Sequence, residues 1–75
     1  MKGIRDDMAS LVRELRKRLD LTQEKFAAKL GVTFPTINRW ENGRAAPSPL
    51  AKQRIQDLLR SMGRAGADLL ARLFS

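Results

Sequence analysis

The side chains with the clearest chemical potential lie in one stretch, between Gln23 and Arg44. This stretch carries amides, hydroxyls and arginines near the ends of two short segments. One segment follows Thr22 and the other follows Thr33. Such groups donate and accept hydrogen bonds, which suits them to binding phosphates and base edges. A helix N-terminus adds N–H groups and a positive dipole end that attract a phosphate. The chemistry we expect from this stretch is binding to a nucleic acid.

The composition argues against catalysis. The chain has no His and no Cys, so it lacks the commonest general base, the commonest metal ligand and any thiolate nucleophile. Its clustered acids, Asp6-Asp7 and Asp20 with Glu24, fall at expected helix ends, where they cap or face solvent. We therefore expect no enzyme, no metal site and no cofactor.

The balance of charge points to an acidic partner. Fifteen Lys and Arg against eight Asp and Glu give a net charge of +7 and a pI near 11.2. A basic domain of this kind is a candidate for nucleic-acid binding, although a basic surface alone could equally meet membranes or acidic proteins. Three Phe and one Trp are few for a single-strand stacking platform. No apolar run approaches the roughly 20 residues of a membrane span, so we expect no membrane association.

The apolar spacing predicts a helix at the start of this 75-residue chain, which we expect to form a single domain over residues 1–75. The helix should end near Leu19–Asp20. Its apolar face comprises Ile4, Met8, Leu11, Val12, Leu15 and Leu19. Most of the cations on the opposite face, which include Arg13 and Arg18, are interpreted as solvated side chains, with Glu14 able to pair with Arg18.

Two capped helices should follow. Thr22 and Thr33 are each placed as N-caps, and Pro35 falls in the first turn of the third helix, where a missing N–H costs little. Gly31 is the natural residue for the tight corner between them, because glycine adopts a positive φ without strain.

The remaining glycine, proline and capping residues predict two more helices. Asn42-Gly43 ends the third helix, and Ser48-Pro49 is a cap and proline that begin the fourth. Gly63 and Gly66 then punctuate a final helix from about Ala67, within a C-terminal segment 64–75.

These residues together resemble the lambda-repressor/Cro-like helix-turn-helix family, over roughly Leu11 to Met62. The family expects a small residue at Ala27, glycine at Gly31 and a β-branched residue at Ile37, and all three are present. The sequences LTQEKFAAKLGV and WENG are also close to the family pattern.

The resemblance implies a fold and a function. The fold is all-α, a compact bundle of five short helices in which the second and third form the helix-turn-helix, with a core over residues 10–62. The third helix, about Thr33–Asn42, should enter the major groove of double-stranded DNA. The implied function is a sequence-specific transcriptional regulator, most simply a repressor in the cytoplasm, associated with the nucleoid.

The resemblance also assigns roles to individual residues. Base contacts are expected from Phe34, Pro35, Thr36 and Arg39. DNA backbone contacts are expected from Gln23, Thr33, Asn38, Asn42 and Arg44. A structural ion pair that ties the first helix to the third is expected between Arg16 and Glu41.

Phe34 and Pro35 depart from the family pattern, in which glutamine or another polar residue commonly stands first. Phenylalanine cannot hydrogen-bond a base edge but can contact a thymine methyl group. Phe34 could instead cover the end of the second helix or meet another protein. Trp40 lies three residues from Ile37 on the inner face, and we expect it in the core rather than stacked on a base.

The last helix has two interpretations. It could close the core of its own subunit, or it could pair with a second subunit, because two half-sites on a two-fold dimer raise affinity. We expect a homodimer, with an interface formed by Leu69, Leu70, Leu73 and Phe74. The competing hypothesis is an antitoxin or adaptor module that binds a protein partner through the same helix.

Overall fold

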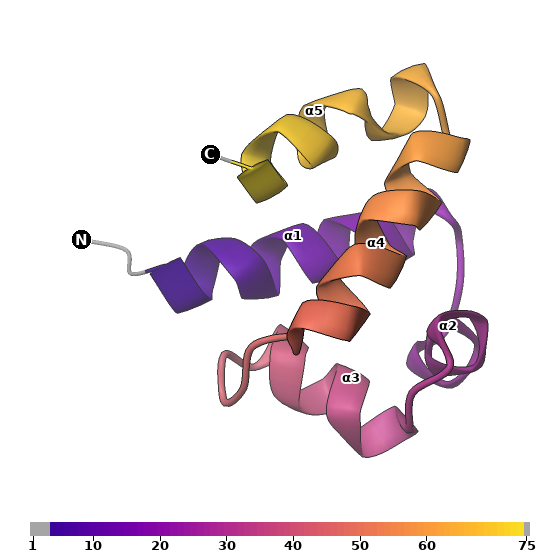
Figure 1. The fold of residues 1–75 in the computed structure, drawn as a ribbon. Coiled ribbons are helices and arrows are strands. Elements are labelled where there is room, and N and C mark those ends of the chain that lie inside the picture. Colours follow the sequence, from indigo (N-terminus) through magenta and orange to yellow (C-terminus); the bar gives the residue numbers. More distant parts are fainter. Residues whose placement is uncertain (1–3, 75) are drawn as a thin grey trace.

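The protein folds into five α-helices (Figure 1). The computed structural model describes the backbone of residues 4–74 and the side chains of residues 8–73. The helices are α1 (Ile4–Arg18), α2 (Gln23–Leu30), α3 (Phe34–Glu41), α4 (Pro49–Ser61) and α5 (Arg64–Phe74). Residues 4–74 contain no β-strand, so the expected all-α bundle is confirmed. In Figure 1, α5 lies along one side of α1, the pair α2–α3 lies on the other, and α4 runs between them. No helix within the described part is long and apolar enough to cross a membrane.

Three side-chain caps fix where the middle helices begin. Thr22 accepts a hydrogen bond from the backbone N–H of Lys25 at 3.2 Å, and Thr33 accepts one from Thr36 at 3.4 Å. Ser48 accepts the corresponding bond in α4. Each cap satisfies an N–H that the helix leaves unpaired and contributes about 1 kcal/mol. The corner between α2 and α3 is made by Gly31, which has φ of 73°. The caps and the corner predicted from sequence are confirmed.

A single core holds α3 in place. Phe26, Leu15 and Ile37 are fully buried, and Trp40 is only 3% exposed. Ala27 is buried as well, so the small residue is where α2 must approach its neighbours. Because Ile37 and Trp40 both point inward, the rotation of α3 about its axis is fixed. The expected core position of Trp40 is confirmed.

The last helix begins at Arg64, earlier than the expected start near Ala67. Gly63, with φ of 60°, makes the turn from α4, whereas Gly66 lies inside α5. A Cβ added at Gly66 would lie 2.5 Å from the backbone oxygen of Leu59. Glycine is present at this position because α5 packs directly on the backbone of α4, so its interpretation as helix punctuation was wrong.

The leucines expected at a dimer interface lie mostly inside the subunit. Leu69 is fully buried and Leu73 is 6% exposed, both within the core that includes Leu15 and Leu59. Leu70 is half-buried against that core. The side chain of Phe74 lies outside the described residues. For Leu69 and Leu73, the structure shows α5 closing its own subunit's core, and in this fold neither offers a surface to a second subunit.

An exposed arginine on α1 holds α5 through hydrogen bonds and an ion pair. Arg18 donates hydrogen bonds to both carboxylate oxygens of Asp68, at 2.6 and 3.0 Å, to the backbone oxygen of Ala65, and to Glu14. The hydrogen bond from Arg18 lowers the pKa of Asp68 to about 2. Arg18 is therefore not one of the merely solvated cations of this face. Its predicted pairing with Glu14 is confirmed, whereas its contacts with α5 were not predicted. Sequence spacing could not reveal a contact between residues 50 positions apart.

Candidate nucleic-acid interface

The outward side of α3 is defined by what its inward side buries. Ile37, Trp40 and Glu41 face the core. The helix therefore turns four of the residues predicted to contact DNA toward solvent, namely Phe34, Pro35, Asn38 and Arg39. Thr36 is half-buried on the same N-terminal turn. These side chains form one exposed surface on α3.

The first turn of α3 combines an exposed ring with paired hydroxyls. Phe34 is 46% exposed, although a ring of this size usually finds cover within its own fold. The hydroxyls of Thr33 and Thr36 lie 2.8 Å apart and share a hydrogen bond. The Thr33 hydroxyl thus contacts both the backbone N–H and the hydroxyl of Thr36, which fixes the position of both hydroxyls.

Arg39 and Arg44 are the exposed cations at the other end of α3. The side chain of Arg39 has no hydrogen-bond or ion-pair partner among the described residues, so its guanidinium is available to a ligand. The backbone N–H of Arg44 donates to the carbonyl of Arg39 at 2.9 Å, across a turn in which Gly43 has φ of 70°. This turn keeps Arg44 beside the last turn of α3.

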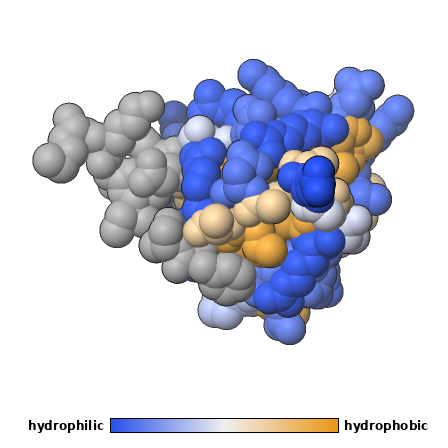
Figure 2. All heavy atoms as spheres, turned by 90° about the horizontal axis from the view of Figure 1, so that it is seen from above, coloured by the Kyte–Doolittle hydropathy of each residue, from blue (hydrophilic) through white to orange (hydrophobic). Residues whose placement is uncertain are grey.

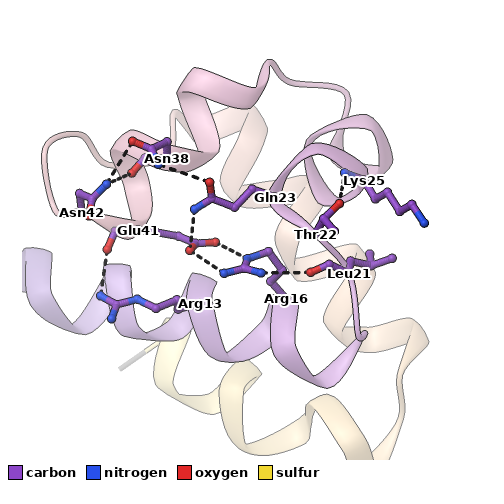
Figure 3. A network of polar contacts seen from close by, with 9 residues as sticks. All are labelled: Arg13, Arg16, Leu21, Thr22, Gln23, Lys25, Asn38, Glu41 and Asn42. Carbon is purple, nitrogen blue, oxygen red and sulfur yellow. Dashed lines mark hydrogen bonds and ion pairs between the residues drawn. The ribbon is translucent and has the colours of Figure 1, made fainter.

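Behind this surface, Arg16 and Glu41 form the expected ion pair (Figure 3). Two nitrogens of the Arg16 guanidinium donate to the two carboxylate oxygens, at 2.7 and 3.0 Å. A third nitrogen donates to the backbone oxygen of Leu21, and Glu41 is 4% exposed. The pair therefore joins three elements at one buried point: α1, α3 and the loop that precedes α2.

The ion pair sets the protonation of Glu41. Burial alone raises the pKa of its carboxyl, but hydrogen bonds from Arg16 and Gln23 outweigh burial and leave the pKa below its ordinary value. Glu41 is consequently ionised at neutral pH and accepts hydrogen bonds without donating any.

Three amides extend outward from Glu41, and sequence analysis did not connect them. The Nε2 of Gln23 donates to a Glu41 carboxylate oxygen at 3.0 Å. The Nδ2 of Asn38 donates to the Oε1 of Gln23 at 3.3 Å. The Nδ2 of Asn42 donates to the Oδ1 of Asn38 at 3.1 Å and to its backbone oxygen. Figure 3 shows this series running from the buried ion pair to the exposed end of α3.

Arg13 is a further residue that the sequence interpretation missed. It lies on the face where most cations were interpreted as solvated, but its guanidinium donates to the backbone oxygen of Glu41 at 2.9 Å. That oxygen is in the last turn of α3, where carbonyls lack intrahelical partners and a cation is favourable. Only the position of Arg13 on α1, about one turn before the Arg16 that was expected to pair, could have suggested this contact.

The described residues contain no group of acids that could hold a metal ion. Apart from the contacts of Arg18 with Glu14 and Asp68, their polar side chains gather on the surface of α3 and in the network behind it. These two together present N–H donors and guanidinium groups. Such groups match phosphate oxygens and the acceptor atoms of base edges.

Comparisons with known proteins agree with this geometry. A family model described as helix-turn-helix matches residues 12–60, which include α2 and α3 entirely. An uncharacterized HTH-type transcriptional regulator from Methanothermobacter thermautotrophicus is 47% identical over 57 residues, covering 76% of this chain and 78% of that protein. The type II methyltransferase M.SsoII from Shigella sonnei is 41% identical over 55 residues.

The match to the methyltransferase covers 69% of this chain but only 14% of the enzyme. The likeness is therefore to a small part of that protein. No solved structure matches the chain.

Proposed function

Because the chain belongs to the lambda-repressor/Cro-like helix-turn-helix family, we propose that it is a sequence-specific transcriptional regulator that binds double-stranded DNA. The observation that carries the proposal is the exposed surface of α3, which is fixed from behind by a buried ion pair. From it project the ring of Phe34 and the side chain of Arg39, which has no partner among the described residues. The net charge of +7 favours approach to DNA.

In the proposed mechanism, contacts to phosphates hold the protein in register. Phosphate contacts position a protein on the duplex without specifying sequence. The groups suited to this role lie at both ends of α3 and at the start of α2. They are Gln23, Thr33, Asn38, Asn42 and Arg44.

With the register set, α3 would read four or five base pairs in the major groove. Arg39 suits a bidentate contact with guanine, which is worth about 1–3 kcal/mol of discrimination. Phe34, with Pro35 beside it, suits a thymine methyl group, and the Thr36 hydroxyl suits a base edge. We propose that the protein represses transcription by occluding a promoter, in the cytoplasm, associated with the nucleoid. Nothing in this role requires an enzymatic step.

Two substitutions should separate positioning from reading. Arg39→Ala should reduce discrimination between the selected site and random DNA by about tenfold, because it removes a base contact. Gln23→Ala should weaken binding to all sequences alike, because it removes a phosphate contact. Fluorescence anisotropy with selected and random duplexes measures both effects. Equal losses on both DNAs for both variants would contradict this division of roles.

We also propose that the regulator binds DNA as a homodimer. Leu69 and Leu73 are occupied in the core, so the part of α5 left for a partner is the side of Leu70 with the exposed Ala67 and Ala71. Residues spaced by three and four lie on one side of a helix. Figure 2 shows apolar side chains gathered among hydrophilic ones on the face of the molecule that carries α5.

Leu70→Asp should convert a dimer to a monomer, because it buries a charge at the proposed contact. Light scattering at tens of micromolar measures the mass. Gln53→Asp on α4, an exposed position, is the matched control and should leave the mass unchanged. A monomeric mass for the wild-type protein, unchanged in Leu70→Asp, would contradict the dimer.

The alternative of an antitoxin or adaptor shares this surface of α5. In this alternative too, Leu69 and Leu73 cannot contact the partner, because both are buried in the core of their own subunit. Co-purification of a second protein at fixed stoichiometry, lost in Leu70→Asp, would favour the alternative over the homodimer.

A further inference from the structure

The orientation of Gln23 and Asn38, two of the three amides in front of Glu41, follows from charge. An ionised carboxylate only accepts hydrogen bonds, so Gln23 must turn its Nε2 toward Glu41. Its Oε1 then faces Asn38, which must turn its Nδ2 toward it. The Oδ1 of Asn38 then faces the Nδ2 of Asn42. One buried charge therefore fixes the direction of Gln23 and, through it, of Asn38. The amide of Asn42 is also held by the backbone oxygen of Asn38.

On Gln23 and Asn38 the groups left over are all of one kind. Asn42 differs, because its Nδ2 already makes two contacts with Asn38. The side-chain oxygens of Gln23 and Asn38 are each engaged by the next amide in the series. Each amide nitrogen carries two N–H groups, and the contacts described use one on Gln23 and one on Asn38. What remains for a ligand is thus N–H donors, on a half-buried and an exposed side chain. Phosphate oxygens accept such bonds and cannot donate any in return.

The charge that imposes this order is itself neutralised. Arg16 contacts both oxygens of Glu41, and Arg13 lies on the backbone oxygen of the same residue. Glu41 is 4% exposed, so its carboxylate lies behind the amides. An approaching phosphate therefore meets the donors without meeting an uncompensated negative charge.

We propose that Glu41 is a positioning residue for DNA binding: it turns the amide of Gln23, and through Gln23 the amide of Asn38, so that their free N–H groups form a phosphate site. Glu41 touches no DNA and acts only through the amides. This inference rests on the proposed function for its ligand but not for the orientation of the amides, which is a property of the protein alone.

The test is Glu41→Gln, a substitution of nearly equal shape. A glutamine at this position can present either its oxygen or its nitrogen to Gln23, so the direction of the series is no longer imposed. We expect affinity for a random duplex to fall about tenfold, the scale of a lost hydrogen bond to a charged group. In the Gln23→Ala background, Glu41→Gln should change affinity less than twofold, because the connection to the other amides is already broken.

The matched control is Asp68→Asn, which removes one negative charge from the exposed ion pair between Arg18 and Asp68. Both variants raise the net charge by one, and long-range attraction to DNA alone would tighten binding in both. We expect weaker binding for Glu41→Gln and no weakening for Asp68→Asn. Equal or tighter binding by Glu41→Gln would overturn the proposal.

A second measurement needs no DNA. In the wild-type protein, NMR should show one set of side-chain N–H resonances for Gln23 and Asn38, with the two protons of each amide well separated. In Glu41→Gln these resonances should double or move toward the values of free amides. Unchanged resonances would overturn the proposed orientation. If the wild-type protein bound no DNA at all, the proposed function and the phosphate role would fail together, while these spectra would still decide the orientation.

If Glu41→Gln does not fold, substitutions at the half-buried Gln23 and the exposed Asn38 replace it in the test. Gln23→Ala and Asn38→Ala should each weaken DNA binding severalfold, and the double variant should lose little more than either, because the two amides act as one unit. Additive losses would overturn the proposal.

Discussion

Replacing Arg16 with methionine should lower the free energy of unfolding by about 3–5 kcal/mol, because it leaves Glu41 buried and unpaired. A domain of this size has a net stability of about the same magnitude. Arg16→Met should therefore be largely unfolded at 25 °C near neutral pH, as measured by circular dichroism and urea titration. Removing Glu41 as well, in Arg16→Met with Glu41→Leu, should recover much of the loss, because no buried charge remains.

The same pair makes a prediction about pH. The folded state holds the pKa of Glu41 below its ordinary value, so the folded protein binds fewer protons here than the unfolded chain. This contribution to stability is fully present above the ordinary pKa near 4.5 and is lost as pH falls through the lower folded value. In Arg16→Met the unpaired carboxyl should instead protonate readily, so the difference in stability between the two proteins should shrink in acid.

Arg18→Met is the matched control, because Arg18 also pairs with a carboxylate but is exposed. Solvent weakens such pairs, and its loss should change the urea midpoint far less. Similar losses for Arg16→Met and Arg18→Met would contradict the account of the buried pair.

Gly66→Ala should destabilise the protein by about 2–3 kcal/mol, although alanine is the better helix former. Helix propensity alone would make the substitution stabilising by about 1 kcal/mol. The added Cβ, however, would lie 2.5 Å from the backbone oxygen of Leu59, and a backbone cannot move aside as a flexible side chain can. We expect α5 to shift away from α4, and urea titration measures the loss.

Ala65→Gly tests the opposite case in the same helix. Ala65 is exposed, so its replacement should cost no more than about 1 kcal/mol through propensity. A stabilised Gly66→Ala would show that α4 and α5 are not in the close contact described here.

The local features of the fold were predictable because they depend on neighbouring residues. Thr22 and Thr33 cap helices that begin at the next residue, and Gly31 makes the corner between them. The buried position of Trp40 followed from its spacing to Ile37. The pairing of Arg16 with Glu41, 25 positions away, came only from the family resemblance.

The missed features depend on which helices lie side by side. Gly66 was read as punctuation because its reason for being glycine is the backbone of Leu59 on another helix. The leucines of α5 form one apolar face, and the pattern alone does not say whether that face meets α1 and α4 or a second subunit. The amides of Gln23, Asn38 and Asn42 were each expected at DNA, but their connection requires the placement of α2 against α3.

Selection of bound duplexes from a random pool tests most directly whether α3 reads DNA. The account predicts enrichment of a palindromic consensus with two half-sites of four or five base pairs, whose centres lie about one helical turn apart. Each half-site should contain a guanine whose preference is lost in Arg39→Ala and a thymine whose preference is lost in Phe34→Ala. A pool with no enriched sequence, from protein that is folded under the same conditions, would contradict the central claim.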